Sequence, residues 1–139
     1  MIQRIQSLFL AISSGAYWSL FGLPFAKTDT AIGSIYQNLT LDLQDHMGLL
    51  ICTIMGGLLS LIAIFLFKSR KLQMSLSYVA ILAGFVLMGT VAYLQVSTDS
   101  IGTYSVGMAM PLAGILFSLL ATVFIKKDDK LVRSMDRLR

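Results

Sequence analysis

Four long stretches of the chain contain no Asp, Glu, Lys, Arg or His. Each stretch exceeds the roughly 18 apolar residues that mark a membrane-crossing helix. The short connections at 68–71 and 97–104 indicate that the helices they join are antiparallel neighbours. The expected fold class is an all-α membrane protein, an antiparallel four-helix bundle in one integral membrane domain over residues 1–139. Its transmembrane helices are predicted at 5–25, 47–67, 72–96 and 105–125.

The charged residues are confined to the segments between and beyond these stretches, and they make up only 13% of the chain. Soluble domains carry about 25%, so an average globular enzyme, a disordered chain and a nucleic-acid-binding module are excluded. Ten of the eleven Lys and Arg residues belong to the N-terminus, the 68–71 turn and the C-terminal tail, whereas Lys27 falls on the opposite side. The positive-inside rule therefore predicts that both termini are cytoplasmic.

The C-terminal tail, residues 126–139, combines basic side chains with an apolar face formed by Leu131, Val132, Met135 and Leu138. This pattern predicts an amphipathic basic helix that lies along the inner lipid headgroups or docks on a cytoplasmic protein partner. The expected partners are thus membrane lipids and a protein subunit of a membrane complex, and no nucleic acid. The residues expected to make these contacts are Lys126, Lys127, Lys130, Arg133 and Arg137.

Small residues recur at four-residue spacing in three of the predicted helices. Because lipid removes the hydrophobic driving force between helices, close packing at small residues must hold them together. The expected packing positions are Gly15, Gly56, Gly57 and Gly114. Packing within one chain is the favoured interpretation, and homo-oligomerisation through one of these faces is the alternative.

The 27–46 loop is the largest predicted segment outside the membrane, and its second part partly alternates apolar and polar residues. Over residues 35–43 this period indicates an extended segment that could form a short β-hairpin. Asp42, Asp45 and His46 follow it as the chain's one cluster of ligand-type side chains. Capping of the second helix, by Asp42 or nearby Thr40 with Asp45 beside the helix dipole, is favoured over a metal site or an acid–base pair.

The predicted membrane interior lacks ionisable side chains. Ion- and proton-coupled transporters usually keep such a group at depth despite its cost, so this class of transporter is disfavoured. Cys52 is the only cysteine, which excludes an intrachain disulfide and a dithiol oxidoreductase. Pro111 lies inside the predicted fourth helix, where a kink is expected.

Three segments on the predicted cytoplasmic side resemble a family of small four-helix inner-membrane proteins of Bacteroidota that is known only as a domain of unknown function. They read MIQRIQ at 1–6, FKSRKLQ at 67–73 and KDDKLVRSMDRLR at 127–139. The resemblance spans essentially the whole chain. It implies a multi-pass protein of a bacterial inner membrane, and it implies no activity.

These patterns together favour a non-enzymatic membrane protein, a small accessory or scaffold subunit that acts through contact and needs no cofactor. Two alternatives stay open. One is passive handling of a lipid or quinone between the helices. The other is a membrane enzyme with a site around Asp42, Asp45 and His46.

Overall fold

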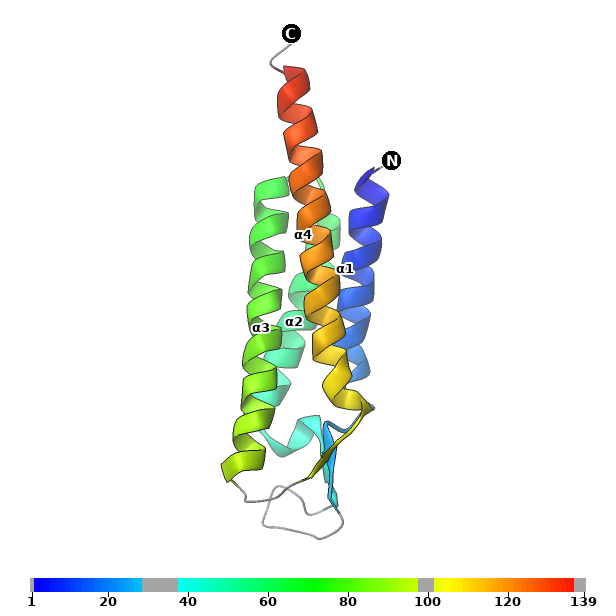
Figure 1. Cartoon of the computed structure of the whole chain (residues 1–139). Helices are drawn as coiled ribbons and strands as arrows, with labels where there is room; N and C mark the ends of the chain where they lie inside the picture. The colour runs from blue at the N-terminus through cyan, green and yellow to red at the C-terminus, as the bar shows by residue number, and fades with distance from the viewer. Residues whose placement is uncertain (1, 29–37, 98–101, 137–139) are drawn as a thin grey trace.

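The computed structural model of the protein describes residues 2–28, 38–97 and 102–136. Four long helices run side by side, and the start of α1 and the end of α4 lie at the same end of the molecule (Figure 1). Three short strands lie at the opposite end, together with two single turns of 3-10 helix. The elements are α1 (Ile2–Ser19), β1 (Ala26–Lys27), β2 (Thr40–Leu41), η1 (Leu43–Asp45), α2 (Met47–Phe65), α3 (Arg70–Ser97), β3 (Thr103–Tyr104), η2 (Val106–Met108) and α4 (Ala109–Asp136).

Each long helix packs mainly against two others: α1 and α3 both contact α2 and α4. Within the described residues, three segments are long and apolar enough to cross a membrane, namely Met47–Phe65, Arg70–Ser97 and Val106–Val132. The predicted second and third spans, 47–67 and 72–96, thus agree with α2 and α3 to within two residues at each end.

The first predicted span, 5–25, was wrong in its outer part, because α1 ends at Ser19. Gly22 and Pro24 follow, and Pro24 cannot donate a helical hydrogen bond. The freed backbone groups find partners elsewhere in the protein: Phe25 N donates to Leu41 O at 2.8 Å, and Gly107 N donates to Pro24 O at 3.1 Å. Non-helical backbone at membrane depth is tolerated where other parts of the protein satisfy it in this way.

The three strands form one small antiparallel sheet in the order β2-β1-β3. Ala26 lies opposite both Leu41 and Tyr104. The β1–β2 pair agrees with the hairpin expected for the 27–46 loop, although residues 29–37 lie outside the described part of the chain. β3 was not predicted from the sequence. Ala26 and Leu41 are completely buried, so the sheet closes one end of the apolar core.

The helix predicted for the basic tail is present as far as Asp136, but it is the continuation of α4. α4 continues without a break to Asp136, and Figure 1 shows its last turns projecting beyond the ends of the other three helices. The kink predicted at Pro111 has no structural basis, since α4 begins at Ala109 and its first turn has no helical hydrogen bond for proline to remove.

Tyr17 of α1 occupies the centre of the four helices and is completely buried. Its hydroxyl donates to Ala80 O of α3 at 2.9 Å. A Cβ added at Gly56 of α2 would lie 2.8 Å from one edge of the Tyr17 ring, and one added at Gly114 of α4 would lie 2.8 Å from the opposite edge. A Cβ at Gly84 of α3 would contact the Tyr17 hydroxyl. One ring therefore fills a space that glycines of three other helices leave open.

The four predicted packing glycines consequently differ in their surroundings. Gly56 and Gly114 face Tyr17, and a Cβ at Gly57 would lie 3.0 Å from Nε1 of Trp18. A Cβ at Gly15 would meet nothing within 4 Å. No neighbour in the described structure therefore requires a glycine at position 15.

Hydroxyl groups of α1 add polar contacts between the helices. Ser13 Oγ donates to Gly114 O at 2.9 Å and lies 2.8 Å from Ser118 Oγ. Ser14 Oγ donates to Gly57 O at 3.0 Å. Both serines are buried. The helices are thus held by small uncharged polar groups and close backbone approach, which suits an apolar surrounding.

Candidate functional site

Basic side chains gather at the end of the molecule where α1 starts and α4 extends. One group, Lys68, Arg70 and Lys71, comes from the α2–α3 turn and the first residues of α3. The other comes from α4 and consists of Lys126, Lys127 and Lys130, all exposed. Two further predicted contact residues are not described in full: Arg133 lies in α4 but its side chain is outside the described structure, as is all of Arg137.

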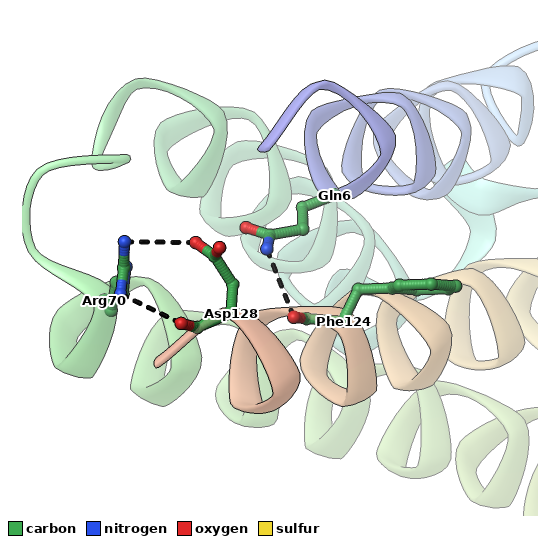
Figure 2. A network of polar contacts seen from close by, with 4 residues as sticks. All are labelled: Gln6, Arg70, Phe124 and Asp128. Atoms are coloured by element: carbon green, nitrogen blue, oxygen red, sulfur yellow. Dashed lines mark hydrogen bonds and ion pairs between the residues drawn. The ribbon is translucent and has the colours of Figure 1, made fainter. Parts of the chain in front are cut away.

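An ion pair joins the two basic groups. Arg70, the first residue of α3, places a guanidinium nitrogen 3.1 Å from the Asp128 carboxylate, and another donates to Asp128 O at 3.3 Å (Figure 2). On the other side of α4, Gln6 of α1 donates from Nε2 to Phe124 O at 3.2 Å. Two different helices therefore hold α4 just below its projecting turns.

The roles of Gln6, Arg70 and Asp128 in this arrangement were not predicted from the sequence. In the sequence, Arg70 belongs to the basic 68–71 turn that indicates topology, and Asp128 belongs to the C-terminal tail. The available signals were acidic residues inside a mostly basic tail and the amide side chain of Gln6 near the start of an apolar helix. Neither signal identifies which helix supplies the partner.

Two of the predicted tail contacts lie over aromatic rings. Lys126 Nζ is 5.4 Å from the centre of the Tyr78 ring on α3, and Lys127 Nζ is 5.5 Å from the centre of the Phe124 ring. An ammonium group within about 6 Å of a ring face is attracted to it. The two aromatic rings therefore place apolar surface directly beside the ammonium groups of these lysines.

A depression of about 730 Å³ separates the α2–α3 turn from α4. Residues 67–72 form one wall, and Asp129 and Val132 of α4 form the other. Cationic, hydroxyl and apolar groups share this surface. A smaller hollow of about 360 Å³ is lined by Lys127, Lys130, Leu131 and Ser134 on α4.

At the opposite end, Asp42, Asp45 and His46 are used for backbone capping. His46 Nδ1 accepts from Gly48 N at 3.0 Å, so His46 caps α2, and the prediction that Asp42 or Thr40 caps this helix was wrong. Asp45 Oδ2 instead accepts from Asp42 N at 2.6 Å across the preceding 3-10 turn. Within residues 2–28, 38–97 and 102–136, His, Cys, Asp and Glu form no group of three that could hold a metal ion.

Three apolar helices of membrane-crossing length, with a charged end, define the class of a multi-pass membrane protein. The chain belongs to a family described as a domain of unknown function, DUF4293, whose family model matches residues 2–138. This match confirms the expected resemblance to an uncharacterised family of this kind. No curated protein and no solved structure matches the chain.

Proposed function

We propose that the protein is a four-span component of a bacterial inner membrane with both termini in the cytoplasm. In this proposal α1 and the turn that follows it complete a fourth crossing beside the three apolar helices. The end of the molecule at which α1 starts and α4 ends in Figure 1, together with the α2–α3 turn, carries most of the basic residues, which supports this orientation. Lys27, in β1 at the other end, lies on the outer side.

Cysteine labelling of intact cells tests this topology. In a Cys52→Ala background, the exposed residues Ser69 and Thr103 lie at opposite ends of the helices. We expect a membrane-impermeant maleimide to label the Thr103→Cys variant in intact spheroplasts, and to label the Ser69→Cys variant only after lysis. Labelling of Ser69→Cys from outside would reverse the orientation.

Within that membrane, the protein acts in this proposal as a non-enzymatic accessory or scaffold subunit. The observation that carries it is the continuous extension of α4 to Asp136. Ion pairing to Arg70 and hydrogen bonding to Gln6 hold its base. Its exposed surface combines the cations of Lys127 and Lys130 with Leu131, whose side chain is 50% exposed. A charged helix with an apolar residue at its surface suits docking to a cytoplasmic face of another subunit.

Co-purification in a mild detergent, followed by mass spectrometry, tests the docking role. We expect the full chain to retain one protein partner in fixed stoichiometry, and a chain lacking residues 130–139 to lose it. A matched variant, Thr103→Ala, changes the opposite end and should keep the partner. Retention of the same partner by the truncated chain contradicts docking through α4, as does the absence of any stoichiometric partner.

A further inference from the structure

The depression between the α2–α3 turn and α4 is lined by side chains to which the proposed docking role assigns no function. Its wall at residues 67–72 spans the change from the apolar end of α2 to the first turn of α3. α2 ends at Phe65 and the membrane-crossing segment of α3 begins at Arg70. In the proposed membrane topology, on which this inference rests, the depression therefore lies at the depth where lipid headgroups meet the acyl region.

Two lysines give this depression a positive charge that the protein leaves open to a ligand. Lys68 and Lys71 are both exposed, and neither forms an ion pair within the described part of the chain. Arg70 is paired with Asp128, so its charge is largely neutralised. Among the described lining residues the one carboxylate is that of Asp129, so the two exposed lysines leave the surface with a net positive charge. An anionic ligand is the occupant that complements this surface.

The first turn of α3 adds donors in the same place. Its early backbone N–H groups have no acceptor within the helix, and they carry the positive end of the helix dipole. Ser69, just before that turn, supplies a hydroxyl to the lining. These groups suit phosphate oxygens, and the two lysines provide the charge that a helix end alone does not.

Apolar side chains lie beside these polar groups. Phe67 is 52% exposed and Leu72 is 56% exposed, and Val132 faces them from α4. A free phosphate ion would gain nothing from such neighbours, whereas the glycerol and upper acyl carbons of a phospholipid would pack on them. Basic pockets between transmembrane helices on the cytoplasmic side are a known mode of anionic lipid recognition.

We propose that this depression is a binding site for an anionic phospholipid. The lipid phosphate lies between Lys68 and Lys71 at the start of α3, and the acyl chains descend along Phe67 and Leu72. This role is independent of the protein partner proposed for α4. It adds a lipid ligand of defined charge on the cytoplasmic leaflet.

Native mass spectrometry of the full chain in detergent tests the site, with dioleoyl-phosphatidylglycerol as the anionic probe and dioleoyl-phosphatidylcholine as the neutral one. We expect preferential binding of phosphatidylglycerol to the wild-type chain. Since each lysine near a lipid charge strengthens binding about fivefold, the Lys68→Gln/Lys71→Gln variant should bind phosphatidylglycerol on the order of 20-fold more weakly. The Lys27→Gln variant removes a positive charge at the opposite end of the molecule and should bind phosphatidylglycerol as the wild type does.

Several results would overturn the proposal. These are equal binding of both lipids, unchanged binding by the Lys68→Gln/Lys71→Gln variant, and an equal loss in the Lys27→Gln variant. Displacement of the lipid by millimolar inorganic phosphate would show that a free anion is the ligand instead. If the pocket variant does not fold, Asp129→Asn gives an independent answer. Removal of that carboxylate should raise the preference for phosphatidylglycerol, and no increase contradicts the site.

The partner experiment distinguishes this proposal from the docking role. Loss of lipid with retention of the protein partner in the Lys68→Gln/Lys71→Gln variant supports a separate lipid site. Unchanged lipid binding by that variant overturns the lipid site and leaves the α4 docking proposal standing. Loss of both ligands together overturns their independence.

Discussion

The space around Tyr17 allows a sharp test of how the helices are packed. Alanine at Gly56 would place a methyl group 2.8 Å from Cε1 of the Tyr17 ring. The ring cannot move aside, because Gly114 lies against its opposite edge and its hydroxyl is bonded to Ala80 O. We therefore expect Gly56→Ala to destabilise the fold although alanine is the better helix former.

The magnitude follows from two opposing effects. Replacing glycine by alanine inside a helix stabilises it by about 1 kcal/mol at most. Forcing an extra methyl group into a filled core costs about 1–3 kcal/mol. At Gly15 only the first effect operates, since a Cβ there meets nothing within 4 Å. Gly56→Ala should therefore be less stable than Gly15→Ala by about 1–3 kcal/mol.

Unfolding of the purified protein in mixed micelles, driven by increasing amounts of sodium dodecyl sulfate, measures this difference. Trp18 is the only tryptophan and stacks on Phe21 at 5.6 Å between ring centres, so its fluorescence reports on the packed state. A Tyr17→Leu background completes a double-mutant cycle, because the smaller side chain leaves room for the added methyl group. There the penalty at Gly56 should disappear.

Equal stabilities of the Gly56→Ala and Gly15→Ala variants would refute this reasoning. A penalty that persists unchanged in the Tyr17→Leu background would refute it as well. Equal stabilities would mean that the helices can move apart at Tyr17 far enough to accommodate the added methyl group. A persistent penalty would mean that the cost at Gly56 arises from some contact other than the ring.

Three other predictions concern polar and backbone contacts. Ser13→Ala removes the hydrogen bonds of Ser13 Oγ to α4 and its 3.4 Å contact with Ser60 Oγ of α2, and it should cost about 1–2 kcal/mol in the same unfolding assay. Arg70→Gln and Asp128→Asn should show a coupling of about 0.5–1 kcal/mol in a double-mutant cycle, weakened by salt because both groups are partly exposed. Gly107→Ala would drive a methyl group into the backbone carbonyl of Pro24, so we expect a loss of more than about 2 kcal/mol in unfolding free energy.

Matched variants control these three predictions. Ser75 bonds only within its own helix and is exposed, so Ser75→Ala should leave stability unchanged within about 0.5 kcal/mol. Gly22→Ala places its methyl group in open space, as its nearest neighbour would be Ser19 O at 4.0 Å. Each prediction fails if its variant behaves like the control. The ion-pair prediction fails if the coupling is absent at low salt.

The sequence predicted the apolar helices well because one property, the absence of charged residues, defines them. Charged residues stop at Lys71 and resume at Asp99, and α3 occupies Arg70–Ser97. The cost of placing charge in lipid makes such boundaries visible in a single sequence. The packing role of Tyr17 was not visible in this way. Its partners lie on three other helices, and hydropathy carries no information about which glycine faces which ring.

The end of α1 shows a second limit of hydropathy. Residues 20–25 are as uncharged as a helix interior, yet they leave the helix after Ser19 and lead into β1. What permits this course is a set of backbone acceptors and donors at Leu41, Ser105 and Gly107. Those groups belong to segments about 16 to 80 residues away along the chain, so only tertiary structure reveals them.

The C-terminal tail shows the opposite case. There the composition changes from apolar to basic at Lys126, yet α4 does not end. Helix formation depends on backbone hydrogen bonds and on residue propensity, and Lys, Leu, Arg and Met are good helix formers in water as well as in lipid. α4 therefore continues from the apolar segment through Lys126 to Asp136. At about 1.5 Å per residue, this extension rises roughly 16 Å. A partner docked on its upper turns would sit clear of the headgroups, while a lipid at residues 67–72 would lie below it. The two proposed ligands can therefore bind the same end of the protein together.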